Sequence, residues 1–357
     1  MSLSVTELLY GSFLDLQLLN PASLMLATAT AVTSLIYFMC PRLLVQMYFR
    51  VAVMWSGMRL KRVIDNKGFT FFYGERGLPK PGQTSMLLLH GFSADHFMWA
   101  SIVKYLPSEI HVIALDLPGH GFTSDPLEGD DIGFKGQLQR IKQFLDLVGI
   151  DKCHVTGVSM GGTLAGLFAA SFQDRVSAVT MCCPSMKTPE DGQLIALYRA
   201  ATARGISLTL DTCPLLPQTA ADLQAMLRVV CYYHSFCPSQ LPINFLLHVV
   251  SDSEGAVELR KERNNFYLQL LHKLLLEESR SALENQLDKI ICPSQVVWGV
   301  EDEVVHVSGA EVLQKKLPNL HHADLIPCCG HAINMDQPRH FAKVVSQFWM
   351  ELQNKQD

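Results

Sequence analysis

The sequence predicts an α/β fold in which a mostly parallel central sheet is flanked by helices on both faces. From Phe69 onward, short apolar runs alternate with amphipathic stretches of helical period, which is typical of this fold class. Residues 157–162 (GVSMGG) separate a strand-like run from a helix of small residues, as a tight strand-to-helix turn does. Between residues 185 and 289 the alternation stops, and a Leu-rich helical stretch broken by prolines indicates an inserted cap.

The amino-terminal part predicts a transmembrane anchor at residues 22–41, after an extracytosolic segment at residues 1–21. No residue between Asp15 and Arg42 is charged, and an apolar helix of about 20 residues spans a bilayer. A cleaved signal peptide is the alternative, because Ala-Thr-Ala sequences at residues 27–31 imitate a cleavage site. The stretch lacks a basic start and is longer than the apolar core of a signal peptide, which has about 7–15 residues, whereas a buried core helix would be shorter.

The charges around this stretch predict its orientation. Only acidic residues, Glu7 and Asp15, precede it. The basic residues that follow are Arg42, Arg50, Arg59, Lys61 and Arg62. By the positive-inside rule everything downstream faces the cytosol, where thiols stay reduced. Residues 42–66, which carry aromatic side chains among spaced basic ones, suit a juxtamembrane amphipathic segment at the interface.

The remaining chain is predicted to form one α/β core in two parts, at residues 67–184 and 290–357, with the helical cap at residues 185–289 between them. Seven apolar runs predict strands at residues 70–73, 85–90, 111–116, 153–158, 176–183, 295–298 and 323–327. The apolar residues of the cap suit its own packing better than a lipid-contacting surface, although different faces can serve both purposes.

Composition excludes several classes of protein. The chain of 357 residues has a formal net charge of −5 at pH 7 and no nucleic-acid-binding motif, so we expect no nucleic acid partner. It contains neither C-x-x-C nor H-E-x-x-H, so we expect no metal. Residues 119–124 begin like a dinucleotide fingerprint but lack its third glycine, and with no Walker loop present we expect no cofactor. The ten cysteines suit buried free thiols.

Ser159 is the candidate nucleophile, because residues 157–161 match the pattern G-x-S-x-G. The glycines on either side relieve crowding on a tight turn that holds a serine hydroxyl clear of the sheet. The pattern alone also arises by chance or in an ordinary glycine turn. Its position between a strand-like run and a helix favours the nucleophile.

The partners of Ser159 are predicted by their order along the chain. Asp302 follows the strand-like run at residues 295–298, and His331 follows the run at residues 323–327. Ser, then Asp, then His is the order of α/β-hydrolases. Asp302 would orient His331, which would take the proton from Ser159. The neighbouring acids and the earlier histidine pair suit solvated positions: Glu301, Glu303, His321 and His322.

The backbone N–H groups of Phe92 and Met160 are the candidate oxyanion hole. Phe92 lies in the peptide at residues 90–93 (HGFS), which ends a strand-like run and can turn a backbone N–H toward Ser159. Met160 directly follows the nucleophile, as the second donor does in this fold. An ordinary strand-end turn is the alternative interpretation of residues 90–93.

The chain resembles a family of membrane-anchored monoacylglycerol lipases, the sixth in the α/β-hydrolase-domain series. The likeness covers nearly the whole chain, including the anchor. It rests on residues 90–94 (HGFSA), 116–120 (DLPGH), 157–162, 264–267 (NNFY), 288–290 (DKI), 298–299 with Asp302, 307–310 (VSGA) and 329–331 (CGH). Val158 stands where these proteins have threonine.

This resemblance implies a serine hydrolase that cleaves monoacylglycerols, such as 2-arachidonoylglycerol, with some activity on lysophospholipids. It places Ser159, Asp302 and His331 at the catalytic positions. Epoxide hydrolases and dehalogenases share the fold but need an aspartate in place of Ser159. A broader lysophospholipase or carboxylesterase, or a non-catalytic membrane interaction protein on the same fold, is the alternative.

The expected topology follows from the anchor, and the expected choice of membrane follows from the resemblance. We expect a single-pass membrane protein whose catalytic domain faces the cytosol, in an endomembrane such as that of the late endosome or lysosome, or in the plasma membrane. The expected partners are the lipid substrates and the bilayer, and the sequence indicates no particular protein partner.

Overall fold

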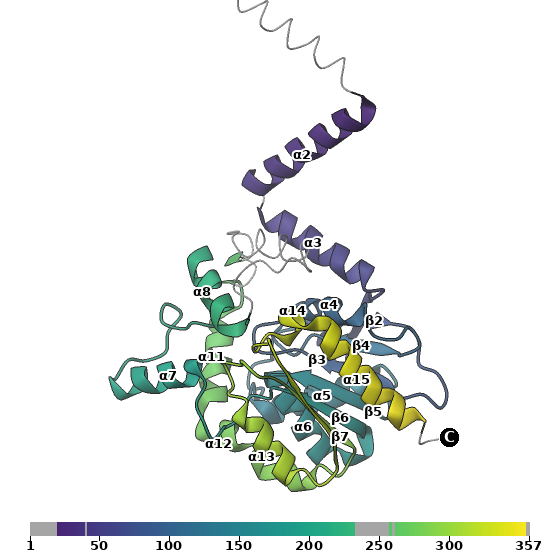
Figure 1. The fold of residues 1–357 in the computed structure, drawn as a ribbon, viewed down its shortest axis with the longest axis vertical. Coiled ribbons are helices and arrows are strands. Elements are labelled where there is room, and N and C mark those ends of the chain that lie inside the picture. Colours follow the sequence, from purple (N-terminus) through teal and green to yellow (C-terminus); the bar gives the residue numbers. More distant parts are fainter. Residues whose placement is uncertain (1–19, 40, 233–256, 259–260, 355–357) are drawn as a thin grey trace, which may run out of the picture.

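The protein contains an eight-stranded sheet in the order β1-β2-β4-β3-β5-β6-β7-β8, seen in a computed structural model that describes residues 20–39, 41–232, 257–258 and 261–354 (Figure 1). The strands are β1 (Arg59–Ile64), β2 (Thr70–Arg76), β3 (Ser85–Leu89), β4 (Val112–Leu115), β5 (Cys153–Val158), β6 (Val176–Cys182), β7 (Ser294–Gly299) and β8 (Leu320–Ile326). The predicted α/β class is confirmed.

The strands from β4 to β8 in this order are parallel, which brings their carboxyl ends to one edge of the sheet. Every residue of β3, β4, β5 and β7 is buried. Strands buried on both faces read as continuous apolar runs, and these runs were therefore visible in the sequence. The functional side chains follow β5, β7 and β8, so the topology gathers them at the carboxyl edge.

Strand β1 was not among the predicted strands. It pairs antiparallel with β2, which itself pairs antiparallel with β4, so the pair forms one edge of the sheet. Five of its six residues are exposed, and its sequence RLKRVI is rich in charge. An edge strand needs neither a continuous apolar run nor a buried face, and charged residues there discourage pairing with other chains.

Helices cover both faces of the sheet. The helices of one set contact one another; they are α4 (Ala100–Val103), α14 (Ile333–Asp336) and α15 (Pro338–Gln353). The other set comprises α5 (Phe134–Leu147), α6 (Met160–Ser171), the 3₁₀ helices η2 (Gln173–Arg175) and η4 (Glu284–Lys289), and α13 (Ser308–Lys316). A further 3₁₀ turn, η1 (His96–Trp99), leads into α4. Of these, α6 packs against β5 and β6 and carries the residues that follow Ser159.

Between β6 and β7 the described residues form helices and no strand. These helices, apart from η4, are α7 (Gln193–Ala203), α8 (Ala220–Val230), α11 (Asn264–Leu275) and α12 (Glu277–Ser281). Tyr267 and Leu271 of α11 are buried in a small apolar cluster with Cys213 and Leu216, and Phe92 packs against this cluster. The segment therefore packs on itself, on the loop after β3 and, through Leu270 and Leu274 of α11, on the main core.

Among the residues that the structure describes, two helices precede the sheet. Helix α2 (Pro21–Met39) extends away from the main body, whereas α3 (Pro41–Trp55) packs against η1 and α4 (Figure 1). Val45 and Val53 of α3 are buried, and Phe49 stacks on Phe97 with ring centroids 5.1 Å apart. Among the described residues, no helix combines the length and apolar character that a membrane crossing requires.

Candidate active site

Ser159 lies on a sharp turn between β5 and α6. Its backbone has φ 57° and ψ −121°, a conformation that L-residues rarely adopt. The turn is held by backbone hydrogen bonds in which Ser159 N–H donates to Cys182 O at 2.9 Å and Thr163 N–H donates to Ser159 O at 3.0 Å. Strain at a single, well-anchored serine is typical of a nucleophile elbow.

The glycines around Ser159 are required by close backbone approach. A Cβ on Gly157 would lie 1.9 Å from Gly161 O, and a Cβ on Gly161 would lie 2.2 Å from Leu89 O. Both distances are far below van der Waals contact. The pattern G-x-S-x-G is thus a packing requirement of this turn, which lets α6 start directly against β3.

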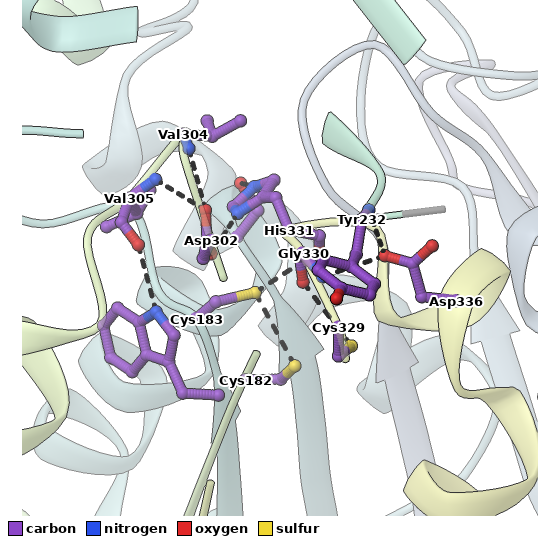
Figure 2. A network of polar contacts seen from close by, with 12 residues as sticks. Cys182, Cys183, Tyr232, Asp302, Val304, Val305, Cys329, Gly330, His331 and Asp336 are labelled. Carbon is purple, nitrogen blue, oxygen red and sulfur yellow. Dashed lines mark hydrogen bonds and ion pairs between the residues drawn. The ribbon is translucent and has the colours of Figure 1, made fainter. Parts of the chain in front are cut away.

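His331 contacts Ser159 across the carboxyl edge of the sheet. Its Nε2 lies 2.9 Å from Ser159 Oγ, and its Nδ1 lies 2.7 Å from Asp302 Oδ2. A carboxylate only accepts hydrogen bonds, so Nδ1 carries the proton and Nε2 is free to accept the proton of the serine hydroxyl. The structure therefore brings together all three side chains that the sequence singled out, and Figure 2 shows Asp302 facing His331.

Asp302 is fixed in the loop after β7. It is 2% exposed, and its Oδ1 accepts the N–H groups of Val304 and Val305 at 2.8 and 2.9 Å (Figure 2). Trp298 Nε1–H in turn donates to Val305 O at 3.0 Å, which ties the loop to the strand. One carboxylate oxygen is thus committed to the loop while the other faces His331.

The acidic neighbours of Asp302 point elsewhere. Glu301 Oε2 accepts the N–H of Cys329 at 2.9 Å, and Glu303 is exposed. His321 and His322 lie in β8, which begins three residues earlier than predicted because pairing with β7 starts at Leu320. His322 pairs with Glu351 at 2.7 Å on the surface, far along the strand from the carboxyl edge.

The environment of His331 raises its pKa. Burial lowers the pKa of this imidazole, but the negative charge of Asp302 raises it by more, so the pKa lies well above the ordinary value of 6.5. An imidazole of raised pKa is a stronger base. It is therefore suited to take a proton from a neighbouring hydroxyl once it is itself neutral.

The predicted oxyanion residues lie next to Ser159. Gly91 packs on the nucleophile so closely that a Cβ there would be 3.3 Å from Ser159 Cβ and 3.9 Å from its Oγ. Phe92 directly follows Gly91, and Met160 is the first residue of α6. The first N–H groups of a helix have no partner within the helix and carry partial positive charge, which suits a developing oxyanion.

His90 holds the loop that carries Phe92, a role that sequence reasoning did not assign. Its Nδ1–H donates to Gly91 O at 2.8 Å, while Leu117 N–H donates to its Nε2 at 2.9 Å. Burial lowers the pKa of His90 to about 4, so the ring is neutral and both contacts persist at neutral pH. Its position between two strand-end loops is not visible from any local pattern.

Within the described ranges of the chain, two groups of side chains have the types and spacing of metal ligands. Cys183 lies with Asp302 and His331, and Asp95 lies with His96 and Asp116, with ligand atoms within 4.8 Å of one another in each group. In the first group both ring nitrogens of His331 already have partners, and burial raises the pKa of the Cys183 thiol, which disfavours the thiolate a metal needs. In the second, His96 Nδ1 and Asp116 form a buried ion pair at 2.8 Å.

A separate cavity of about 200 Å³ lies at the opposite end of the sheet. It is lined by residues at the amino ends of the strands, including Thr84, His154 and Ser177, and by Trp349 of α15. Ser159 follows the carboxyl end of β5, so this cavity is not part of the site described above.

The carboxyl edge of the sheet thus presents a strained serine, a basic imidazole of fixed tautomer and a carboxylate that orients it. Such a set activates a hydroxyl for attack on a carbonyl carbon. Two of the three side chains are essentially shielded from water, which strengthens the interactions between them.

Comparisons with known proteins agree with this site. Residues 84–338 match the alpha/beta hydrolase fold family. The chain is 35% identical to human monoacylglycerol lipase ABHD6 over 324 residues, covering 89% of this chain and 90% of that protein. It is 33% identical to Xenopus laevis monoacylglycerol lipase abhd6-A, covering 96% of this chain and 98% of that protein. A crystal structure of a membrane phospholipase A, described as a bacterial virulence factor, superposes with a TM-score of 0.70 at 26% identity, covering 93% of this chain and 98% of that one. The chain is therefore an enzyme of the α/β-hydrolase fold and belongs to the monoacylglycerol lipase ABHD6 family.

Proposed function

We propose that this enzyme hydrolyses the ester bond of monoacylglycerols, such as 2-arachidonoylglycerol, to a fatty acid and glycerol through an acyl-enzyme on Ser159. The contact of His331 Nε2 with Ser159 Oγ at 2.9 Å is the observation that carries the mechanism. The names of the relatives at 33–35% identity support the substrate class.

Acylation begins when Ser159 Oγ attacks the ester carbonyl carbon while His331 Nε2 takes the hydroxyl proton. The carbonyl oxygen becomes an oxyanion, which the N–H groups of Phe92 and Met160 stabilise. When the C–O bond breaks, His331 returns the proton to the departing glycerol oxygen, and Ser159 holds the fatty acyl group as an ester.

Deacylation repeats these steps with water. His331 takes a proton from a water molecule that attacks the acyl carbon, and then returns it to Ser159 Oγ as the fatty acid leaves. Asp302 keeps the imidazole in one tautomer and stabilises its positive charge in both halves of the reaction.

A lysophospholipase activity is the second candidate, because a membrane phospholipase A of known structure is 26% identical over 93% of this chain. Both substrates carry one acyl ester, and they differ in the alcohol that leaves. A release panel with purified protein in detergent separates them. We expect release of glycerol from monoacylglycerols to be faster than release of the phosphate-bearing alcohol from lysophospholipids.

Ser159→Ala is the control for this panel and is expected to release neither alcohol. Faster turnover of lysophospholipids would overturn the proposed substrate class while leaving the mechanism intact. A purified wild-type protein that turned over no ester would instead favour a non-catalytic role on the same fold.

We also propose that residues 22–41 anchor the enzyme in a membrane and that α3 lies along its surface. The absence of charge between Asp15 and Arg42 supports the anchor. One face of α3 packs on the body, whereas a second face carries exposed apolar side chains at helical spacing. These are Leu43, Met47, Val51, Met54 and Trp55, and Trp55 is 77% exposed. A substrate with a long acyl chain resides in the bilayer, so an anchored enzyme meets it at high local concentration.

The proposed topology places the catalytic domain in the cytosol, at an endomembrane or the plasma membrane. The basic residues that follow the anchor support this orientation. Protease added to intact cells is expected to leave the catalytic domain uncut, and digestion is expected only after permeabilisation. Digestion in intact cells would overturn the orientation.

A further inference from the structure

The end of α8 is joined to the loop that carries His331. Ala332 N–H donates to Val230 O at 2.7 Å, so the backbone just after His331 is bound to the last residue of the helix. Asp336 Oδ2 accepts two more N–H groups, that of Tyr232 at 2.8 Å and that of Gly330 at 2.9 Å (Figure 2). We call residues 230–232 the cap clasp.

Asp336 lies at the end of the short helix α14 and is 4% exposed. A buried carboxylate is costly unless it accepts hydrogen bonds, and bonds from N–H groups to a carboxylate are stronger than neutral ones. One oxygen of Asp336 therefore binds the cap clasp and the histidine loop at the same time. Neither segment can shift without breaking a charge-assisted bond.

The packing between the two segments leaves no space. A Cβ on Gly330 would lie 2.9 Å from Tyr232 N and 3.0 Å from Val230 O. Glycine is thus required at position 330 by the closeness of the cap clasp. His331 sits between Gly330 and Ala332, both of whose N–H groups are bound, so its backbone is fixed on both sides.

The distance between His331 and Ser159 depends on this backbone. The imidazole contacts Asp302 and Ser159, and the Cys183 thiol donates to the backbone O of His331 at 3.7 Å, so the placement of the main chain contributes to how far Nε2 reaches over the elbow. A displacement of ~1 Å between reacting groups can cost ~10²-fold in rate. The cap clasp is therefore in a position to control the reactivity of the site.

We propose that Asp336 is a positioning residue, which holds His331 over Ser159 by tying the histidine loop to the cap clasp. This inference deepens the proposed function and rests on it. Asp336 touches no reacting atom, and it acts only through the backbone of residues 330–332. Packing of the cap clasp against the histidine loop and alignment of His331 with Ser159 are consequently coupled.

The test compares Asp336→Ala with Asp336→Asn in the full chain. The alanine variant loses the acceptor, so we expect fluorophosphonate labelling of Ser159 and turnover of a short soluble ester to slow by about 10²-fold. The asparagine variant keeps an acceptor oxygen, so we expect both rates to recover to within about fivefold of wild type. Amide hydrogen exchange at Gly330 and Tyr232 is expected to accelerate about tenfold or more in the alanine variant alone.

Asp222→Ala is the matched control. Asp222 caps the other end of α8, where its Oδ2 accepts the N–H groups of Gln218 and Thr219. Its removal loosens the same helix without touching the histidine loop, so labelling of Ser159 should stay within about twofold of wild type. Gly330→Ala places a methyl group against the cap clasp and should therefore slow labelling as Asp336→Ala does. This second variant keeps the proposal testable if Asp336→Ala fails to fold.

The outcomes separate this proposal from the proposed function. Rapid labelling of folded Asp336→Ala, equal to that of wild type, would overturn the positioning role and leave the mechanism standing. Loss of turnover on long-chain monoacylglycerols alone, with the short ester and labelling unchanged, would also overturn it, because Asp336 would then hold only the cap. Absence of labelling in the wild type would instead remove the proposed function itself.

Discussion

Three acidic side chains stand in a row after β7, and only the middle one reaches the catalytic histidine. Asp302 is buried with Oδ2 2.7 Å from His331 Nδ1, whereas Glu303 is exposed. We predict that Asp302→Asn lowers kcat/KM on a monoacylglycerol by about 10⁴-fold, because the amide favours the wrong imidazole tautomer. Glu303→Gln should change kcat/KM by less than about twofold. Similar losses in the two variants would show that Asp302 is misassigned.

The raised pKa of His331 predicts the pH dependence of catalysis. The imidazole must be neutral to accept a proton, so kcat/KM should rise with pH and level off above the pKa of His331, with a midpoint above 6.5. Asp302→Asn removes the charge that raises this pKa, so the midpoint measured on its residual activity should move to lower pH. A profile that falls through this range, or a midpoint unmoved by the substitution, would contradict the assignment.

At the scale of single residues, the sequence predicted the catalytic side chains, because they follow apolar strand-like runs. Ser159, Asp302 and His331 each lie just beyond such a run, and their order restricts the fold. His90 and Asp336 could not be predicted in the same way. Their roles come from backbone groups of distant segments, Leu117 for the former and Tyr232 for the latter, and no local pattern records such contacts.

The elbow between β5 and α6 depends on close contact with β3. A Cβ on Gly161 would lie 2.2 Å from Leu89 O and 2.5 Å from His90 O, both backbone atoms that cannot move independently. We predict that Gly161→Ala lowers the free energy of unfolding by at least about 2 kcal/mol and abolishes activity. Gly82 has φ 76° and open space around it. Gly82→Ala should therefore cost only about 1 kcal/mol and keep full activity, as measured by chemical denaturation and ester turnover.

The buried pair of His96 and Asp116 links η1 to the end of β4. Burial lowers the pKa of His96, but the hydrogen bond and charge of Asp116 raise it by more, so the folded pKa lies above the ordinary 6.5. A raised pKa stabilises the fold fully below about pH 6.5, and this contribution is lost as pH rises through the folded value. The stability difference between wild type and His96→Gln should therefore shrink from pH 6 to pH 9.

Denaturation at several pH values measures this difference, and His322→Gln is the matched control. His322 forms an ion pair with Glu351 on the surface, where such pairs contribute about 0–1 kcal/mol. The control should show no comparable trend. A difference that grows with pH for His96→Gln would contradict the sign of the pKa shift.

At the scale of elements, the buried strands were predictable, whereas the exposed strand β1 and the first residues of β8 were not. The strands β3, β5 and β7 are buried throughout and largely apolar because helices cover both faces of the sheet. Strand β1 carries Arg59, Lys61 and Arg62 and has one strand neighbour, β2, so its hydrogen bonds with β2 define it and its composition does not. Strand β8 begins at Leu320, before the predicted residue 323, for the same reason: pairing with β7 defines its first residues and their composition does not.

At the scale of the whole molecule, the hydrolase body is preceded in the described part of the chain by helices α2 and α3. The apolar outer face of α3 predicts that this helix helps the enzyme reach substrate in a bilayer. Replacing Met47 and Trp55 by glutamate should remove ~2 kcal/mol or more of favourable transfer into the membrane interface. We therefore expect kcat/KM on monoacylglycerol in vesicles to fall by about 30-fold or more, with unchanged turnover of a short soluble ester.

Leu78→Glu is the control for this prediction. Leu78 is also well exposed but lies after β2, outside α3. It should leave the vesicle reaction unaffected. An equal loss in all variants, or a loss that also appears with the soluble ester, would indicate damage to the body of the enzyme and contradict a membrane role for α3.

The central claim is that Ser159, activated by His331, is the nucleophile of this molecule. Intact-protein mass spectrometry after treatment with a fluorophosphonate tests it most directly. We predict that wild type gains one phosphonyl group, located on the peptide that contains Ser159, and that Ser159→Ala gains none. An unlabelled wild type, or a Ser159→Ala variant that is labelled as fast as wild type, would contradict the account.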